Sequence, residues 1–117
     1  MNIVDLSEDL VSLYCVCLED WSQEMKEAGT RKRDWYEAMR GRGLRVKLAL
    51  DDAGTVGGMI QYAPIEETFA SGKDLYFILC IWVHGYKVGR GDFRHRGMGK
   101  ALLQAAEDDA RSLGAKG

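Results

Sequence analysis

Proline, cysteine and long apolar runs are all scarce in this sequence of 117 residues. There is one proline, and of the three cysteines Cys15 and Cys17 stand two positions apart, a spacing that points helical side chains in different directions. We therefore expect no disulfide framework and no metal site. The longest uninterrupted apolar run, Leu75 to Val83, is far below the ~18–20 residues of a membrane-spanning helix, so it predicts a strand and no membrane association.

The sequence also lacks an excess of basic residues. Sixteen Lys and Arg stand against eighteen Asp and Glu, a net charge of −2, which argues against a surface built for nucleic acid. The first ten residues, MNIVDLSEDL, contain no basic segment followed by an apolar one, so we expect no secretory signal and a cytoplasmic protein. With 46% hydrophobic and 29% charged residues, the composition predicts that residues 1–117 form one ordinary globular domain.

The spacing of the apolar residues predicts the element order β-α-α-β-β-β-α. A short strand over Ile3–Leu6 precedes a helix that starts after Ser7 and extends to about Trp21, with an apolar residue every three or four positions. Gly29 interrupts this pattern, and Thr30 predicts the start of a second, shorter helix.

From Leu44 onward the apolar period changes to two. The segments 44–50 and 56–62 alternate on either side of a turn-forming cluster and predict a β-hairpin. Leu75–Val83 is apolar at both alternating sets of positions, which predicts the deepest, central strand. A last helix opens at Gly97 and ends by Gly114, so the fold class is α/β with a central mixed sheet.

The segment from Val83 to Lys100 runs from a strand through a glycine-rich turn into a helix. The first amides of a helix have no partners within it, so such a turn can hold an anion. From Lys87 to Lys100 there are five basic residues and one acidic residue, Asp92. No Gly-Lys-Ser/Thr tripeptide or Gly-x-Gly-x-x-Gly fingerprint is present, which argues against the two common nucleotide-binding motifs.

The hexapeptide Arg94-His95-Arg96-Gly97-Met98-Gly99 resembles the Arg/Gln-x-x-Gly-x-Gly/Ala signature of the GNAT superfamily of N-acetyltransferases. It lies between an apolar strand and a helix, as that signature does, and the element order is similar to the first two-thirds of the GNAT fold. This resemblance implies an enzyme that transfers an acetyl group from acetyl-CoA to a primary amine by direct attack through a tetrahedral intermediate.

The resemblance also implies which residues bind acetyl-CoA. Backbone amides of the signature would hold the pyrophosphate, the end of the preceding strand would pair with the pantetheine arm, and a strand amide near Cys80 would meet the thioester oxygen. The implied cofactor-binding residues are Ile81, Trp82, Val83, Arg94, His95, Arg96, Gly97, Met98, Gly99 and Lys100.

No residue is assigned as general base or acid from the sequence. Glu66 and Glu67 are the first candidates for the base, and Asp74 and His84 are further ones. The amine acceptor, a small molecule or a protein, stays open. A non-catalytic acyl-CoA-binding or regulatory module is the alternative function, and an RNA-binding patch over Lys87–Lys100 is disfavoured because no nucleic-acid motif accompanies it.

Two features depart from the family pattern. The loop from His84 to Phe93 is longer than the usual connection between strand and signature. The family also continues after the signature helix with further strands and a helix, so we expect a truncated domain here. An apolar strand edge left open in this way favours association, such as a homodimer.

Overall fold

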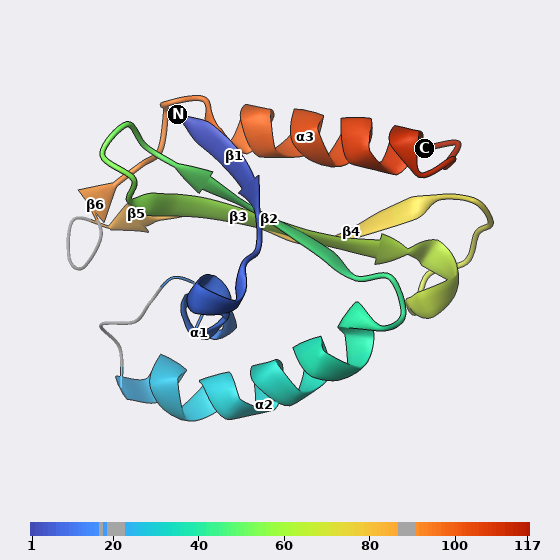
Figure 1. The fold of residues 1–117 in the computed structure, drawn as a ribbon, viewed down its shortest axis with the longest axis horizontal. Helices are drawn as coiled ribbons and strands as arrows, with labels where there is room; N and C mark the ends of the chain where they lie inside the picture. Colours follow the sequence, from blue (N-terminus) through green and yellow to red (C-terminus); the bar gives the residue numbers. More distant parts are fainter. Residues whose placement is uncertain (17, 19–22, 87–90) are drawn as a thin grey trace.

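The computed structural model describes residues 1–16, 18, 23–86 and 91–117. Its main sheet has four antiparallel strands in the order β1-β2-β3-β4, and a small hairpin, β5–β6, follows. Figure 1 shows α3 on one face of this sheet and α1 and α2 on the other. The α/β class and the predicted order of the main elements are confirmed. The strands are β1 (Asn2–Asp5), β2 (Arg45–Leu50), β3 (Val56–Pro64), β4 (Tyr76–Val83), β5 (Gly85–Tyr86) and β6 (Gly91–Asp92), and the helices are α1 (Val11–Cys15), α2 (Gln23–Arg40) and α3 (Met98–Ser112), with single 3₁₀ turns η1 (Glu8–Leu10) and η2 (Ile65–Glu67).

The deepest strand is β3 and not β4, so the prediction for Leu75–Val83 is wrong in this respect. Helices cover both faces of β3, and all of its residues except Pro64 are buried. β4 is instead an outer strand of the sheet, where Ile78 and Ile81 are 40% and 44% exposed. An apolar run indicates that a strand has two apolar faces, but its position in the sheet depends on which distant strands pair with it.

Helix α2 runs without a break through Gly29, so the predicted restart at Thr30 is wrong. A Cβ atom at Gly29 would lie 3.1 Å from Cγ1 of Val16. The missing side chain therefore lets α1 and α2 approach closely, while the helical backbone continues. The first helix was expected to reach about Trp21; α1 ends at Cys15, and Trp21 lies outside the described residues.

A polar network attaches α3 to the sheet. Asp109 of α3 accepts hydrogen bonds from the Tyr62 hydroxyl (2.6 Å) and from Nε and Nη2 of Arg45. Burial alone would raise the pKa of Asp109, but the hydrogen bonds from Arg45 and Tyr62 outweigh it and hold that pKa below its usual value. Burial is the main cause that raises the pKa of Tyr62, and the hydrogen bond to Asp109 is the second. The network fixes how α3 sits across β2 and β3.

Candidate functional site

Backbone hydrogen bonds anchor the segment between β4 and α3 to strand β3. The His84 N–H donates to the Gly57 carbonyl and the Phe93 N–H donates to the His84 carbonyl, each at 2.8 Å. The Phe93 ring is buried directly above Gly57, where a Cβ atom would lie 2.4 Å from the ring. Gly57 therefore leaves room for the ring, and the ring fixes the chain just before the signature.

An ion pair braces the start of the signature. Asp92 accepts hydrogen bonds from the Arg94 backbone N–H (3.0 Å), from Arg94 Nε (3.1 Å) and from Arg94 Nη2 (3.0 Å). The hydrogen bonds from Arg94 lower the pKa of Asp92 to about 2. The Arg94 side chain crosses Gly85 so closely that a Cβ there would lie 2.6 Å from Arg94 Cδ. The guanidinium is thus held against its own loop.

The backbone at the start of α3 has amides without a partner in the helix, and Gly97 among them borders open space. Gly97 caps the helix in the left-handed conformation (φ 81°), and the Ala101 N–H donates to the Gly97 carbonyl at 3.0 Å. By helix geometry, the N–H groups of residues 97–100 have no acceptor within α3. A Cβ atom at Gly97 would meet nothing within 4 Å, whereas one at Gly99 would lie 3.8 Å from Val83. The amides therefore lie at the end of β4 with space above them.

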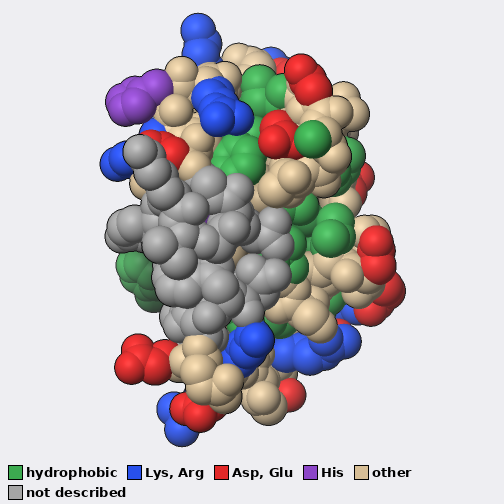
Figure 2. Space-filling model, turned by 90° about the vertical axis from the view of Figure 1, so that its left-hand side faces the viewer, with side chains coloured by type: hydrophobic (Ala, Val, Ile, Leu, Met, Phe, Trp, Pro, Cys, Tyr) green, Lys and Arg blue, Asp and Glu red, His purple; other side chains and the backbone are tan. Residues whose placement is uncertain are grey.

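Positive charge surrounds these amides. Arg94, Arg96 and Lys100 are exposed, and the Arg96 guanidinium lies 5.1 Å from the centre of the Phe93 ring. Figure 2 shows Lys, Arg and His side chains on the upper part of this end of the molecule. Lys87 and Arg90, which the sequence analysis counted in the same patch, lie outside the described residues. Helix amides, the helix dipole and basic side chains together suit a phosphate group.

Strand β4, which leads to these amides, contains an irregularity. Cys80 is opposite Gln61 and Ile78 is opposite Tyr62, so Leu79 is an extra residue on β4. Such a bulge bends a strand and turns its backbone locally away from its neighbour. At the strand's other end, the Tyr76 N–H donates to the Gly117 carbonyl at 2.9 Å.

Comparison with known proteins identifies the family. A family model described as "Acetyltransferase (GNAT) family" matches residues 7–117. The chain belongs to the GNAT family. Among curated proteins, none matches the chain.

Solved structures share the fold of this GNAT protein. AAC(6')-Iy, in complex with the bisubstrate analogue CoA-S-monomethyl-acetylneamine, has a TM-score of 0.71 at 17% identity, over 98% of this chain and 74% of the other. The aminoglycoside antibiotic 6'-N-acetyltransferase AAC(6')-IG from Acinetobacter haemolyticus has a TM-score of 0.69 at 18% identity, over 99% and 75%. A Trypanosoma brucei acetyltransferase has a TM-score of 0.66 at 21% identity, over 98% and 78%. At identities of 17–21% these similarities show a shared fold alone.

The two glutamate base candidates of this GNAT protein lie away from the signature loop. Glu66 and Glu67 belong to η2, before β4, and the signature follows the strand's other end. The seven steps along β4 correspond to about 23 Å. Glu66 Oε2 accepts the Asp74 N–H at 3.2 Å, and backbone hydrogen bonds lower the pKa of Glu66. His84, a further candidate, lies beside the loop instead, where its carbonyl accepts the Phe93 N–H, and its side chain is fully buried.

Sequence reasoning missed Asp92 and Phe93 as organisers of the signature loop. Asp92 was counted only as the one negative charge among basic residues. Its spacing of two residues before Arg94 is the available signal, because a carboxylate can accept the backbone N–H two positions later. The contact between Phe93 and Gly57 has no local signal, since 36 positions separate the two residues.

The helices and the metal-ligating side chains of the described residues bear on membrane and metal binding. None of their helices is long and apolar enough to cross a membrane. No group of three or more His, Cys, Asp or Glu side chains among them could hold a metal ion.

Proposed function

We propose that this GNAT protein is an N-acetyltransferase that transfers the acetyl group of acetyl-CoA to a primary amine. The observation that carries the proposal is the set of amides at residues 97–100, which have no acceptor within α3 and lie among basic side chains, next to the open space at Gly97. A nucleotide cosubstrate with a pyrophosphate suits that position, because a phosphate can approach a backbone that has no side chain in the way.

The implied binding residues fit acetyl-CoA in two parts. The amides of His95 to Lys100 would hold the pyrophosphate, with Arg96 and Lys100 adding charge and Arg94 keeping the loop in shape through Asp92. Main-chain groups of Ile81, Trp82 and Val83 would pair with the pantetheine arm, in the way that an added strand pairs with a sheet edge. The bulge at Leu79 lies next to these residues, and a backbone N–H there would meet the thioester oxygen.

The proposed reaction needs no covalent enzyme intermediate. The neutral amine nitrogen attacks the thioester carbon, the carbonyl electrons move to oxygen, and the intermediate collapses with loss of the CoA thiolate, while the amine gives up a proton. A backbone N–H at the oxyanion lowers such a barrier by about 3–4 kcal/mol in other acyl-transfer enzymes. For a lysine-like amine, deprotonation at pH 7 costs about 4.6 kcal/mol, so a base matters.

Glu67 is the base candidate to test first. The carboxylate of Glu66 already accepts the Asp74 N–H, which lowers its affinity for a proton. Glu67 is exposed in the same turn. The acceptor stays a primary amine of a small molecule or a protein, and association through the outer edge of β4 stays a prediction.

An acetylation assay tests the proposed function. The protein is incubated with acetyl-CoA and, in turn, a lysine peptide, spermidine and an aminoglycoside. The aminoglycoside is included because a solved structure of similar fold is named as an aminoglycoside 6'-N-acetyltransferase. Free thiol and the mass of each amine are followed. We expect at least one amine to be acetylated. Glu67→Gln should lower kcat, whereas Glu24→Gln, at an exposed position of α2, should leave kcat unchanged. Binding of acetyl-CoA without acetylation of any primary amine would contradict the proposal and favour a non-catalytic acyl-CoA-binding module.

A further inference from the structure

The coenzyme position given above leaves the first part of β4 to the acceptor. The pantetheine arm would pair with Ile81 to Val83, and the thioester would lie at the Leu79 bulge. Residues 76–78 precede that bulge and are not used by the coenzyme. Figure 1 shows this part of β4 beside the connection from β3, at the opposite end of the strand from the signature loop. We therefore expect the amine to approach the thioester along residues 76–78.

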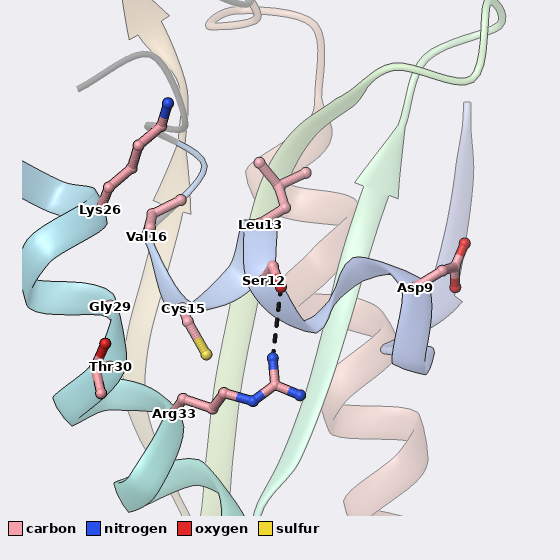
Figure 3. Close-up of a pocket in the computed structure, with 9 residues that line it drawn as sticks. All are labelled: Asp9, Ser12, Leu13, Cys15, Val16, Lys26, Gly29, Thr30 and Arg33. Carbon is pink, nitrogen blue, oxygen red and sulfur yellow. Dashed lines mark hydrogen bonds between the residues drawn. The ribbon is translucent and has the colours of Figure 1, made fainter. Parts of the chain in front are cut away.

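Phe77 is the residue of this part of β4 that faces the same side of the sheet as Leu79. It is opposite Ala63, which is buried with residues of α1 and α2, and Leu79 packs against the same cluster. Residues directly opposite each other on neighbouring strands share a face. The described residues that line the cavity between α1 and α2 (Figure 3) all come from segments 9–16 and 26–33. None of them belongs to β4, so that cavity does not by itself bring an amine to the bulge.

An exposed aromatic ring lies next to Phe77. Phe69 is 89% exposed, more than any other large apolar side chain that the structure describes. Its ring centre lies 5.4 Å from that of Phe77, with 74° between the ring planes. A ring exposed to this degree is not inside a pocket, whereas sites for small molecules enclose most of the ligand. Exposed aromatic rings are instead typical of contacts with another polypeptide, which closes over them.

Hydrogen bonds hold the backbone on both sides of Phe69. The Thr68 N–H (3.1 Å) and the Thr68 hydroxyl (2.8 Å) both donate to the Ile65 carbonyl. The Ala70 N–H donates to the Thr68 hydroxyl at 3.2 Å, and the Ile65 N–H donates to the Leu75 carbonyl at 2.9 Å. The ring is therefore already positioned, so its burial by a partner costs little ordering of the loop.

The charge of the same connection suits a partner that carries a lysine. Glu66, Glu67 and Asp74 are opposed by Lys73 and by Lys116, whose Nζ lies 3.8 Å from Asp74, so the local charge is −3 + 2 = −1. Backbone hydrogen bonds lower the pKa of Glu66, which keeps its carboxylate ionised at neutral pH. The signature loop at the other end of β4 is basic. A lysine-bearing segment is thus attracted to the connection and repelled from the loop.

We propose that the amine acceptor is a lysine in a polypeptide segment, and that Phe69 and Phe77 bind an apolar side chain two positions from that lysine. The inference rests on the proposed acetyltransferase function and names its substrate class. Phe77 and Leu79 are two residues apart, about 7 Å along the strand. Two positions of an extended peptide span the same distance, and their side chains point to the same side. The apolar side chain therefore contacts the rings while the lysine amine meets the thioester.

Steady-state acetylation of two peptides tests this inference. One is acetyl-Phe-Gly-Lys-Gly-Phe-amide, and the other has Ala in place of both Phe residues; spermidine is the small amine. We expect kcat/KM for the Phe peptide to exceed that for the Ala peptide by about fivefold or more. Phe69→Ala should remove this difference by raising KM while kcat stays unchanged, since the ring acts on binding alone. Phe69→Leu keeps an apolar side chain and should stay closer to the wild type.

Controls show whether the ring itself is responsible. Leu113→Ala removes an exposed apolar side chain from the end of α3, on the other face of the sheet, and should change kcat/KM for either peptide by less than about twofold. Phe69→Ala should keep the melting temperature of the wild type, because the ring is exposed. Amide NMR shifts of Thr68 and Ala70 on titration with the Phe peptide report binding at the rings independently of turnover.

The outcomes separate this inference from the proposed function. Equal kcat/KM for the two peptides, or preferred acetylation of spermidine that Phe69→Ala leaves unchanged, would overturn the inference and keep the function. A large fall in melting temperature in Phe69→Ala would also overturn it, because the ring would then be covered by the protein itself or by a second copy. Shifts at Thr68 and Ala70 without acetylation of any amine would contradict the function and not the docking of the peptide. Absence of those shifts overturns the inference in every case.

Discussion

Replacement of Gly57 by alanine should displace the ring that fixes the signature loop. The added Cβ would lie 2.4 Å from Phe93 Cγ and 2.5 Å from Cδ1, and the ring cannot yield easily because it is 4% exposed and its backbone N–H is bonded to His84. Overpacking of a core by one methyl group costs about 1–3 kcal/mol. We expect the upper part of that range in the free energy of unfolding of Gly57→Ala, together with weaker acetyl-CoA binding.

A double-mutant cycle in urea tests the cause. Phe93→Leu alone should cost about 1 kcal/mol, because a smaller side chain leaves part of the site unfilled. In the double variant the alanine methyl enters that space. Its loss in free energy of unfolding should therefore be smaller than the sum of the losses in the two single variants by about 1 kcal/mol or more. Gly41→Ala is the control, since its Cβ would come no closer than 3.8 Å to another atom. Additive losses would refute the reasoning.

Three further predictions concern stability and pH. Asp109→Asn should lower the free energy of unfolding in urea by about 1–3 kcal/mol. Because the folded pKa of Asp109 is lowered, its contribution to wild-type stability is present above about pH 4 and is lost on acidification. The variant should lack this part of the fall in stability at acid pH. Asp92, whose pKa is lowered to about 2, should likewise stay ionised and hold Arg94 down to low pH. Asp92→Asn lacks this ion pair, so its affinity for acetyl-CoA, measured by fluorescence at pH 7, should be lower than that of the wild type. An unchanged affinity would contradict the bracing role of Asp92. Gly29→Leu should destabilise the protein by about 1–3 kcal/mol in thermal unfolding, because Val16 leaves no room between α1 and α2, and a rise in stability would contradict that packing.

The parts of the fold that local signals determine were predictable. The hairpin of β2 and β3 follows from period-two alternation around a turn. Helix α3 begins just after Gly97 and ends just before Gly114, as the glycine positions indicate. The signature loop is also local, since its strand, turn and helix are consecutive in the sequence.

Features that depend on contacts between distant residues could not be predicted. The apolar run of β4 gave no indication that this strand is an outer one, because strand order is decided by pairing with β3. Gly29 was read as a helix interruption because the sequence does not reveal that Val16 packs against it. Equally, nothing in the sequence connects Arg33 with Ser12, which lie 21 positions apart on two helices.

Acetyl-CoA binding to three forms of residue 99 tests the central claim most directly. Gly99 is the second residue of α3, its Cβ would make an ordinary contact with Val83, and an acidic residue there is favourable to the helix dipole. Gly99→Asp should therefore fold at least as well as Gly99→Asn, its neutral match, and yet repel a pyrophosphate at the amides. By calorimetric titration we expect wild type and Gly99→Asn to bind acetyl-CoA and Gly99→Asp to lose binding by about tenfold or more. Equal binding by the two variants would contradict the placement of the coenzyme at the start of α3.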